Sequence, residues 1–316
     1  MTAYVKENGI WKKSNLSSVK VDGEWKKTKK GFVKVDGVWK RFFSAGNEIT
    51  SDIGEQTDYV KIVAGEEQTW RLWTWDGAGA DGEATASFEV GTSIADFEIL
   101  LLGMGGCAPG DTGMGGGGGG WVRATASKDD MPEGTYNFTL GQYYRDAQGS
   151  AVFSLNVTSQ LQILDTTLTA TRGGNGGVRN AGSSGTGGGG GVGAVSGSIT
   201  SFSTGSGGAG GFNYGSGGSA GTYSNISGEE LDYCGGGGSG AYKTTVTTYG
   251  GPGWDSSLNG SANASGGYGA NMGANRPVGE IGGIGKRGGG AGGSSYQQYK
   301  YQPGSNGVLM IAYRID

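Results

Sequence analysis

Apolar and polar residues alternate along several short stretches between residues 46 and 172, and this pattern predicts β-strands. The predicted strands are 68–75, 86–90, 95–102, 135–140, 151–157 and 161–171. Glycine and Asp-Gly turns separate them, and no stretch has the spacing of an amphipathic helix. The chain ends in one more apolar run, 307–313, which needs a neighbouring strand. We therefore predict an all-β protein in which residues 46–172, closed by 305–316, form a β-sandwich or jelly roll.

The first 45 residues contain a repeat with a period of 14 residues. Its apolar positions are Val5, Val19 and Val33, each followed six residues later by Trp11, Trp25 or Trp39. Asn-Gly or Asp-Gly lies at the centre of each unit, and these pairs favour two-residue hairpin turns because both central residues need positive φ. The repeat therefore predicts three short hairpins, or one meander, in which the Val and Trp of each unit share one face. A unit of this size cannot bury such a face alone, so we expect it to dock onto something else.

This repeat region is strongly basic. It carries eleven Lys and Arg against four Asp and Glu, a net charge of +7 that leaves −11 for the rest of the chain. One interpretation is a dock for an acidic partner, and the other is a solvated lysine face that protects strand edges. Both interpretations are compatible with docking onto a protein partner. The candidate attachment residues are Trp11, Trp25, Trp39, Val19 and Val33. We expect that nucleic acid is not the partner.

Glycine dominates the second half of the chain. The 72 glycines are concentrated in 173–293, with a shorter run at 113–120. A flexible linker is the simplest reading, but the stretch is long, aromatic residues interrupt it, and the apolar closing strand follows it. The ordered alternative is a bundle of polyglycine helices of the polyproline II type over about 173–304, with three residues per turn and N–H groups directed at neighbouring helices. Collagen is excluded because there are only 5 prolines and no Gly-X-Y period.

The aromatic residues within and after the glycine runs are the candidate recognition residues. They are Phe212, Tyr214, Tyr223, Tyr242, Tyr249, Trp254, Tyr268, Tyr296 and Tyr299. Aromatic rings suit flat sugar faces and protein hot spots. The alternative is that these rings cap the bundle, because glycine supplies no apolar cover.

The residue inventory gives little support for an enzyme. The chain has no His, which removes the usual catalytic triads and most catalytic zinc sites. Acidic groups at 129–133 and 229–232 could pair carboxylates or bind Ca²⁺, but neither has EF-hand spacing and solvated turns explain them better. We expect no catalysis, no cofactor and no metal.

The two cysteines and the hydropathy of the chain indicate the cellular compartment in which it is made. Cys107 and Cys234 both adjoin glycine runs, so they could form one disulfide, or they could be two separate buried thiols, as cytoplasmic synthesis favours. The first residues lack a signal-peptide pattern, and the longest aliphatic run, 99–102, is too short to span a membrane. We expect synthesis in a cytoplasm and no membrane insertion.

Four motifs follow one another in a fixed order. They are Phe88-Glu-Val leading to Phe97-Glu-Ile-Leu-Leu-Leu-Gly-Met-Gly-Gly106, then Pro132-Glu-Gly-Thr-Tyr-Asn-Phe-Thr-Leu-Gly141, Ala170-Thr-Arg-Gly-Gly-Asn-Gly-Gly177, and Gly307-Val-Leu-Met-Ile-Ala-Tyr313. Over residues 85–316 this set resembles the glycine-rich domain of phage tail-fibre and adhesin proteins.

The resemblance implies a virion protein, made in the bacterial cytoplasm, that binds a host surface glycan or outer-membrane protein through non-catalytic loops. Residues 1–45 would attach it to other tail or fibre proteins, and 46–316 would form the glycine-rich body. A homo-oligomer is compatible with this role. A purely architectural virion protein, such as a fibre, collar or head decoration, is the alternative, and a depolymerase is a third class.

Overall fold

The structure is a computed structural model. It describes residues 49–51, 53–76, 83–91, 94, 96–108, 114–142, 144–145, 151–152, 158–177, 187–211, 218–239, 266–267, 287–291 and 303–315, and the backbone of six strands between residues 3 and 44. The described residues form strands and turns but no helix, which confirms the all-β prediction.

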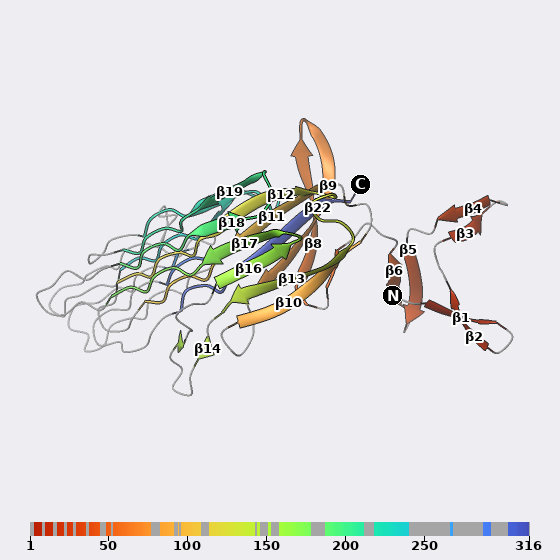
Figure 1. The fold of residues 1–316 in the computed structure, drawn as a ribbon, viewed down its shortest axis with the longest axis horizontal. Helices are drawn as coiled ribbons and strands as arrows, with labels where there is room; N and C mark the ends of the chain where they lie inside the picture. Colours follow the sequence, from red (N-terminus) through yellow and green to blue (C-terminus); the bar gives the residue numbers. More distant parts are fainter. Residues whose placement is uncertain are drawn as a thin grey trace, which may run out of the picture.

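Two six-stranded antiparallel sheets make up the body (Figure 1). The first has the order β18-β17-β16-β13-β10-β7, with bounds Gly193–Ser196, Thr166–Thr171, Thr158–Ile163, Gly134–Gly141, Glu83–Val90 and Ile49–Thr50. The second has the order β19-β12-β11-β22-β9-β8, with bounds Phe202–Gly205, Trp121–Ser127, Asp96–Leu102, Val308–Arg314, Glu66–Asp76 and Glu55–Val63. The C-terminal strand β22 thus lies in the middle of the second sheet, between β11 and β9, as its apolar sequence requires.

The main hydrophobic core lies between the inner faces of the two sheets. Alternate residues of the strands contribute to it, as in the pair Ile99 and Leu101, which are completely buried. Trp75 is its aromatic centre, with ring centroids 5.2 Å from Phe88 and 5.4 Å from Phe138. These contacts are consistent with a β-sandwich.

A second apolar layer covers the outer face of the second sheet. Leu72, Leu102 and Met310 point to this side and pack under Ile226 and Tyr233. The last two residues belong to a small hairpin made of β20 (Thr222–Ser224) and β21 (Leu231–Tyr233) and the turn between them. The sheet is therefore buried on both faces, which explains the almost continuous apolar run of β11.

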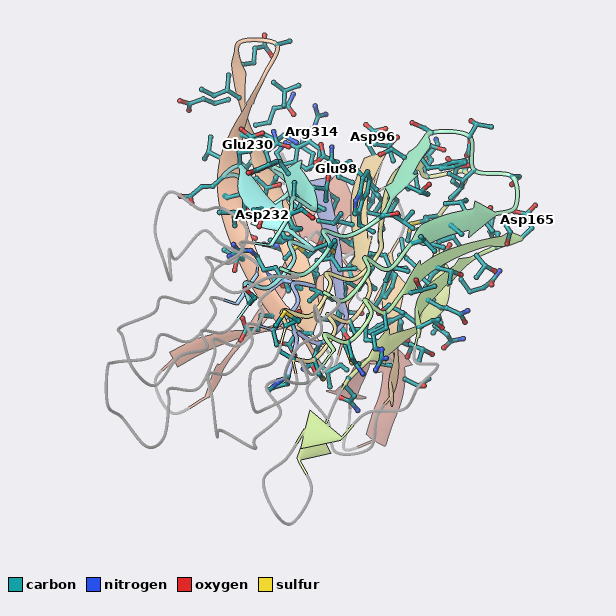
Figure 2. All side chains as sticks on the ribbon, turned by 90° about the vertical axis from the view of Figure 1, so that its left-hand side faces the viewer. Asp96, Glu98, Asp165, Glu230, Asp232 and Arg314 are labelled. Carbon is teal, nitrogen blue, oxygen red and sulfur yellow. The ribbon has the colours of Figure 1, made fainter. Side chains whose placement is uncertain are left out.

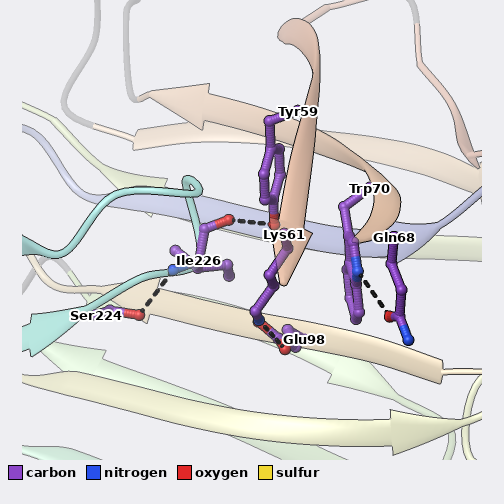
Figure 3. Close-up of polar contacts among 7 residues, drawn as sticks. All are labelled: Tyr59, Lys61, Gln68, Trp70, Glu98, Ser224 and Ile226. Carbon is purple, nitrogen blue, oxygen red and sulfur yellow. Dashed lines mark hydrogen bonds and ion pairs between the residues drawn. The ribbon is translucent and has the colours of Figure 1, made fainter. Parts of the chain in front are cut away.

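Polar contacts fix this outer layer in place (Figure 3). The Tyr59 hydroxyl donates to the Ile226 carbonyl at 2.8 Å, and burial raises the pKa of this phenol well above its usual value. Lys61 lies over the Trp70 ring, with its Nζ 4.8 Å from the ring centroid, and makes an ion pair with Glu98 at 2.5 Å. Lys61 thus covers one face of the Trp70 ring, and Trp70 is buried in this outer layer.

Several strands differ from the prediction. The stretch 161–171 is a hairpin, β16 and β17, because the chain reverses at Leu164, whose φ is +47°. Strands β8 and β12 were not predicted, and β18 and β19 belong to the sheets although they lie within the stretch assigned to the glycine bundle. Strand β15 covers Ala151–Val152, paired with β14 (Tyr144–Arg145), and the rest of the predicted strand 151–157 lies outside the described residues.

The N-terminal repeat forms three separate two-stranded hairpins, as predicted. They are β1–β2 (Ala3–Glu7 and Ile10–Ser14), β3–β4 (Ser18–Val21 and Glu24–Lys27) and β5–β6 (Lys30–Val35 and Val38–Ser44). Each leaves two residues between its strands, which fits the Asn-Gly and Asp-Gly signal.

The predicted shared face of Val and Trp concerns side chains that lie outside the described part of the chain, but the backbone register of the three hairpins is defined. Backbone pairing places Trp25 opposite Lys20, and Val19 opposite Lys26. The same register places Val33 opposite Lys40 and Trp39 opposite Lys34. Trp11 likewise lies opposite Lys6.

Candidate functional site

Residues 114–120 hydrogen-bond to three other segments in a repeating order of three. The N–H groups of Met114, Gly117 and Gly120 donate to carbonyls of segment 171–177, those of Gly115 and Gly118 to segment 206–211, and those of Gly116 and Gly119 to segment 287–291. The N···O distances are 2.7–3.1 Å. Every third N–H group of this stretch is therefore directed at the same neighbouring segment.

The carbonyl groups of the same stretch accept from three further segments. Segment 187–191 donates to Gly115 and Gly118, segment 234–239 to Gly116, and segment 103–108 to Gly117 and Gly120. Residues 114–120 thus lie at the centre of six neighbours, all held by backbone hydrogen bonds. We call these seven segments together the glycine lattice.

Close approach explains why the centre of the lattice is glycine. A Cβ added at Gly116 would lie 2.1 Å from the Gly106 carbonyl oxygen, and one added at Gly118 would lie 1.8 Å from that of Cys234. Real Cβ atoms essentially never come within 3.0 Å of such an atom. None of residues 115–120 has a positive φ, so the space between backbones, and not an unusual backbone conformation, requires glycine here.

The lattice continues strands of both sheets beyond the sandwich. Strand β11 leads into segment 103–108, and β17 leads into 171–177. Segment 114–120 leads back into β12. Figure 1 shows this part projecting from one end of the sandwich. The sandwich therefore fixes where the lattice segments begin.

The far ends of the lattice segments lie together. Met114 bonds to Gly177, Gly115 to Gly211, and Gly116 to Ala291. Met114 is the first described residue of its segment, and Gly177, Gly211 and Ala291 are the last described residues of theirs. The described residues that flank 109–113, 178–186 and 212–217 thus lie at a common end, whereas Arg287, which follows 268–286, lies at the sandwich end, where its carbonyl accepts from the N–H of Cys234. We call the common end the lattice end.

Most candidate recognition residues belong to connecting stretches outside the described residues. They are Phe212, Tyr214, Tyr242, Tyr249, Trp254, Tyr268, Tyr296 and Tyr299. Because their segments meet at the lattice end, the chain brings the attachment points of these stretches together although they are spread over some 90 residues of sequence. The sequence offered these rings as candidates but carried no signal for this convergence.

Tyr223 is the one candidate ring that the structure describes, and it lies away from the lattice end. It belongs to β20, on the outer layer of the second sheet, and is 43% exposed. Its carbonyl accepts a hydrogen bond from Nη2 of Arg123 on β12. Arg123 and the neighbouring Trp121, whose indole donates to the Ser206 carbonyl at 3.2 Å, were not singled out from the sequence.

The two cysteines do not form the disulfide considered from the sequence. Both are free and buried. Burial raises the pKa of Cys107 to about 11, and burial together with the nearby Asp232 raises that of Cys234. The thiol of Cys234 lies 3.7 Å from the Gly120 carbonyl, so it packs against the lattice instead of reaching another sulfur.

The acidic groups act as turn-forming residues. The Asp130 carboxylate accepts hydrogen bonds from the backbone N–H and the hydroxyl of Ser127, both at 2.8 Å. Figure 2 shows Glu230 and Asp232 on the β20–β21 hairpin and Asp165 at the separate β16–β17 turn. Among the described residues, no three His, Cys, Asp or Glu side chains gather closely enough to hold a metal ion. That part of the chain also contains no helix able to span a membrane.

A family assignment follows from comparison with known proteins. A model of the glycine-rich domain family matches residues 78–314, from the sandwich through the lattice to the closing strand, and the chain belongs to this family. A search of curated proteins found no match to this chain.

Proposed function

We propose that this chain is a receptor-binding protein of a phage tail fibre or tail tip, and that its glycine lattice is a bundle of polyglycine II helices that supports the recognition loops. The observation that carries the proposal is the three-residue repeat of hydrogen bonds around residues 114–120. Three residues per turn is the period of the polyproline II helix, and such a helix must satisfy its N–H groups sideways.

A lattice of this kind favours binding through its loops. Each segment end is held by backbone hydrogen bonds to several neighbours, so the loops begin and end at fixed points. Fixed ends lower the ordering cost of binding. Since the lattice is made by backbone groups, the connecting stretches are free to vary in sequence without a loss of packing. The aromatic residues that they carry supply the contact area for a host glycan or an outer-membrane protein.

The N-terminal hairpins have a different role in this proposal. Each hairpin is a separate two-stranded unit, too small to be stable alone, and lysine lies opposite each tryptophan. We assign residues 1–45 to attachment to other virion proteins, with the mature protein located in the virion. No catalytic step is part of the proposal.

Antibody labelling of assembled particles in the electron microscope tests this function. An antibody against residues 240–265 should label the distal end of a fibre or the tail tip. Label on the capsid or along a tail shaft would contradict the receptor-binding role and support a purely architectural one. An antibody against residues 1–45 that labels only dissociated particles would support the attachment role.

A further inference from the structure

Strand β8 forms a long open edge of the second sheet. It pairs with β9 over all nine residues, from Glu55 to Val63, and has no second partner among the described strands. The opposite side of the sandwich is closed, because Val192 and Ser206 form a β-bridge next to β18 and β19. Open edges of this length usually carry features that prevent pairing with another chain.

Strand β8 lacks these protective features. It has no proline and its pairing with β9 is continuous, without a bulge. Its one lysine, Lys61, is held on the outer face of the sheet by Glu98 at 2.5 Å. The Asp58 carboxylate is held by Arg71 in a two-pronged contact of 2.6 and 2.7 Å. Two of the three charges of the strand, those of Asp58 and Lys61, are therefore paired within the sheet, and the third, Glu55, lies at its first residue.

Apolar side chains line the other face of the same strand. Val60 is 58% exposed and Ile62 is 71% exposed. They point to the core side of the sheet, since Tyr59 and Lys61 occupy the outer side. The first sheet ends there with the two-residue strand β7, so it does not cover them.

We propose that β8 pairs with β8 of a second copy of this chain, in an antiparallel register centred on Val60. This register places Val60 opposite its counterpart, Tyr59 opposite Lys61, and Asp58 opposite Ile62, so no like charges face each other. Pairings offset by an odd number of residues would turn one strand face over, and registers centred on Asp58 or on Lys61 would place identical charges opposite each other. The strand is thus self-complementary, and pairing would join two six-stranded sheets into one.

Such a dimer would bring two N-terminal repeat arms to one place. Residues 1–48 lead directly into β7 and β8, at the edge where the copies meet. Two arms attached to one particle raise the effective concentration of the second once the first is bound. The inference is independent of what the lattice end binds.

Cysteine cross-linking of the full chain tests the register. Directly opposed residues of an antiparallel pair have Cβ atoms about 4.5–5.5 Å apart, so Val60→Cys should give a disulfide-linked dimer under mild oxidation. The native thiols do not interfere, because Cys107 and Cys234 are both buried. Ile62→Cys is the matched control: it lies on the same face but faces Asp58, so it should remain unlinked. Cross-linking of Ile62→Cys without Val60→Cys would overturn the proposed register.

Light scattering after size-exclusion chromatography tests the dimer itself. The unmodified chain should have twice the mass of 32.0 kDa, and Val60→Lys, which opposes two charges, should be a monomer with an unchanged circular dichroism spectrum. Leu164→Lys, an equally exposed apolar position on another hairpin, should remain a dimer. A monomeric or trimeric unmodified chain would contradict the proposal, as would a dimer that survives Val60→Lys.

Discussion

A single glycine can be essential or replaceable in this protein, depending on what its missing Cβ would meet. Gly188 and Gly189 are neighbours in one lattice segment. A Cβ on Gly188 would lie 2.0 Å from the Gly174 carbonyl oxygen and 2.5 Å from the Gly117 nitrogen, whereas a Cβ on Gly189 would meet nothing within 4 Å. The run of identical letters in the sequence hides this difference, because it depends on which face of the segment points inward.

Alanine substitution at these two positions should therefore give opposite results. Gly188→Ala should lower the free energy of unfolding by about 3 kcal/mol or more, because the obstructing atoms belong to the backbone and cannot move as a side chain can. Gly189→Ala should change it by less than about 0.5 kcal/mol. Denaturant titration of both variants measures the difference, and equal losses would show that the segment is not packed as described.

The buried thiols give a prediction for alkaline pH. The pKa of Cys107 is raised to about 11 in the folded chain, from an ordinary value of 9.0. A raised pKa means that the contribution to stability is complete below pH 9 and is lost as the pH rises toward 11, since the unfolded thiol ionises first. Stability should therefore fall over this range, and Cys107→Ala should reduce the slope by up to about 1.4 kcal/mol per pH unit.

Thiol titration provides the control for that experiment. Two thiols should react with a thiol reagent in denaturant and neither should react quickly in the native protein. Fast native reaction would contradict the burial, and fewer than two thiols in denaturant would indicate a disulfide.

At the scale of elements, the strands with long apolar runs could be predicted from the sequence, and the edge strand β8 could not. The runs around Trp73, Ile99 and Leu309 are long and apolar because those strands are buried on both faces, so their sequences identify them. Strand β8 has no fully buried face, so its mixture of charged and apolar residues gives no clear strand signal in the sequence. It forms a strand because it pairs with β9. The hairpin at Leu164 was missed because a leucine with positive φ has no turn signature.

The outer β20–β21 hairpin offers a test of how one element is held. Tyr59→Phe removes the hydroxyl that donates to the Ile226 carbonyl and leaves that carbonyl without this donor. The expected loss is about 1–2 kcal/mol, with faster amide exchange confined to residues 222–233. Arg314→Ala, at an exposed position on the same sheet, serves as the control. Unchanged exchange at 222–233 in Tyr59→Phe would show that the apolar layer alone holds the hairpin.

At the scale of the whole molecule, composition suggested an ordered glycine bundle but could not predict its arrangement. The three-residue repeat of hydrogen bonds around residues 114–120 joins segments separated by up to about 175 residues, and glycine sequences carry no side-chain pattern that identifies partners. The convergence of the connecting stretches at the lattice end follows from that pairing, so it was likewise invisible in the sequence.

The most direct test of the account is competition for host cells. Under the proposed function, the purified chain should bind bacterial host cells and reduce phage adsorption to them. The combined variant Tyr249→Ala, Trp254→Ala, Tyr268→Ala should need a concentration about tenfold higher or more to reduce adsorption equally, because aromatic hot spots dominate binding. Tyr223→Ala, away from the lattice end, should compete as well as the unmodified chain. Competition that is absent altogether, or that depends on Tyr223 and not on the other three, would contradict recognition at the lattice end.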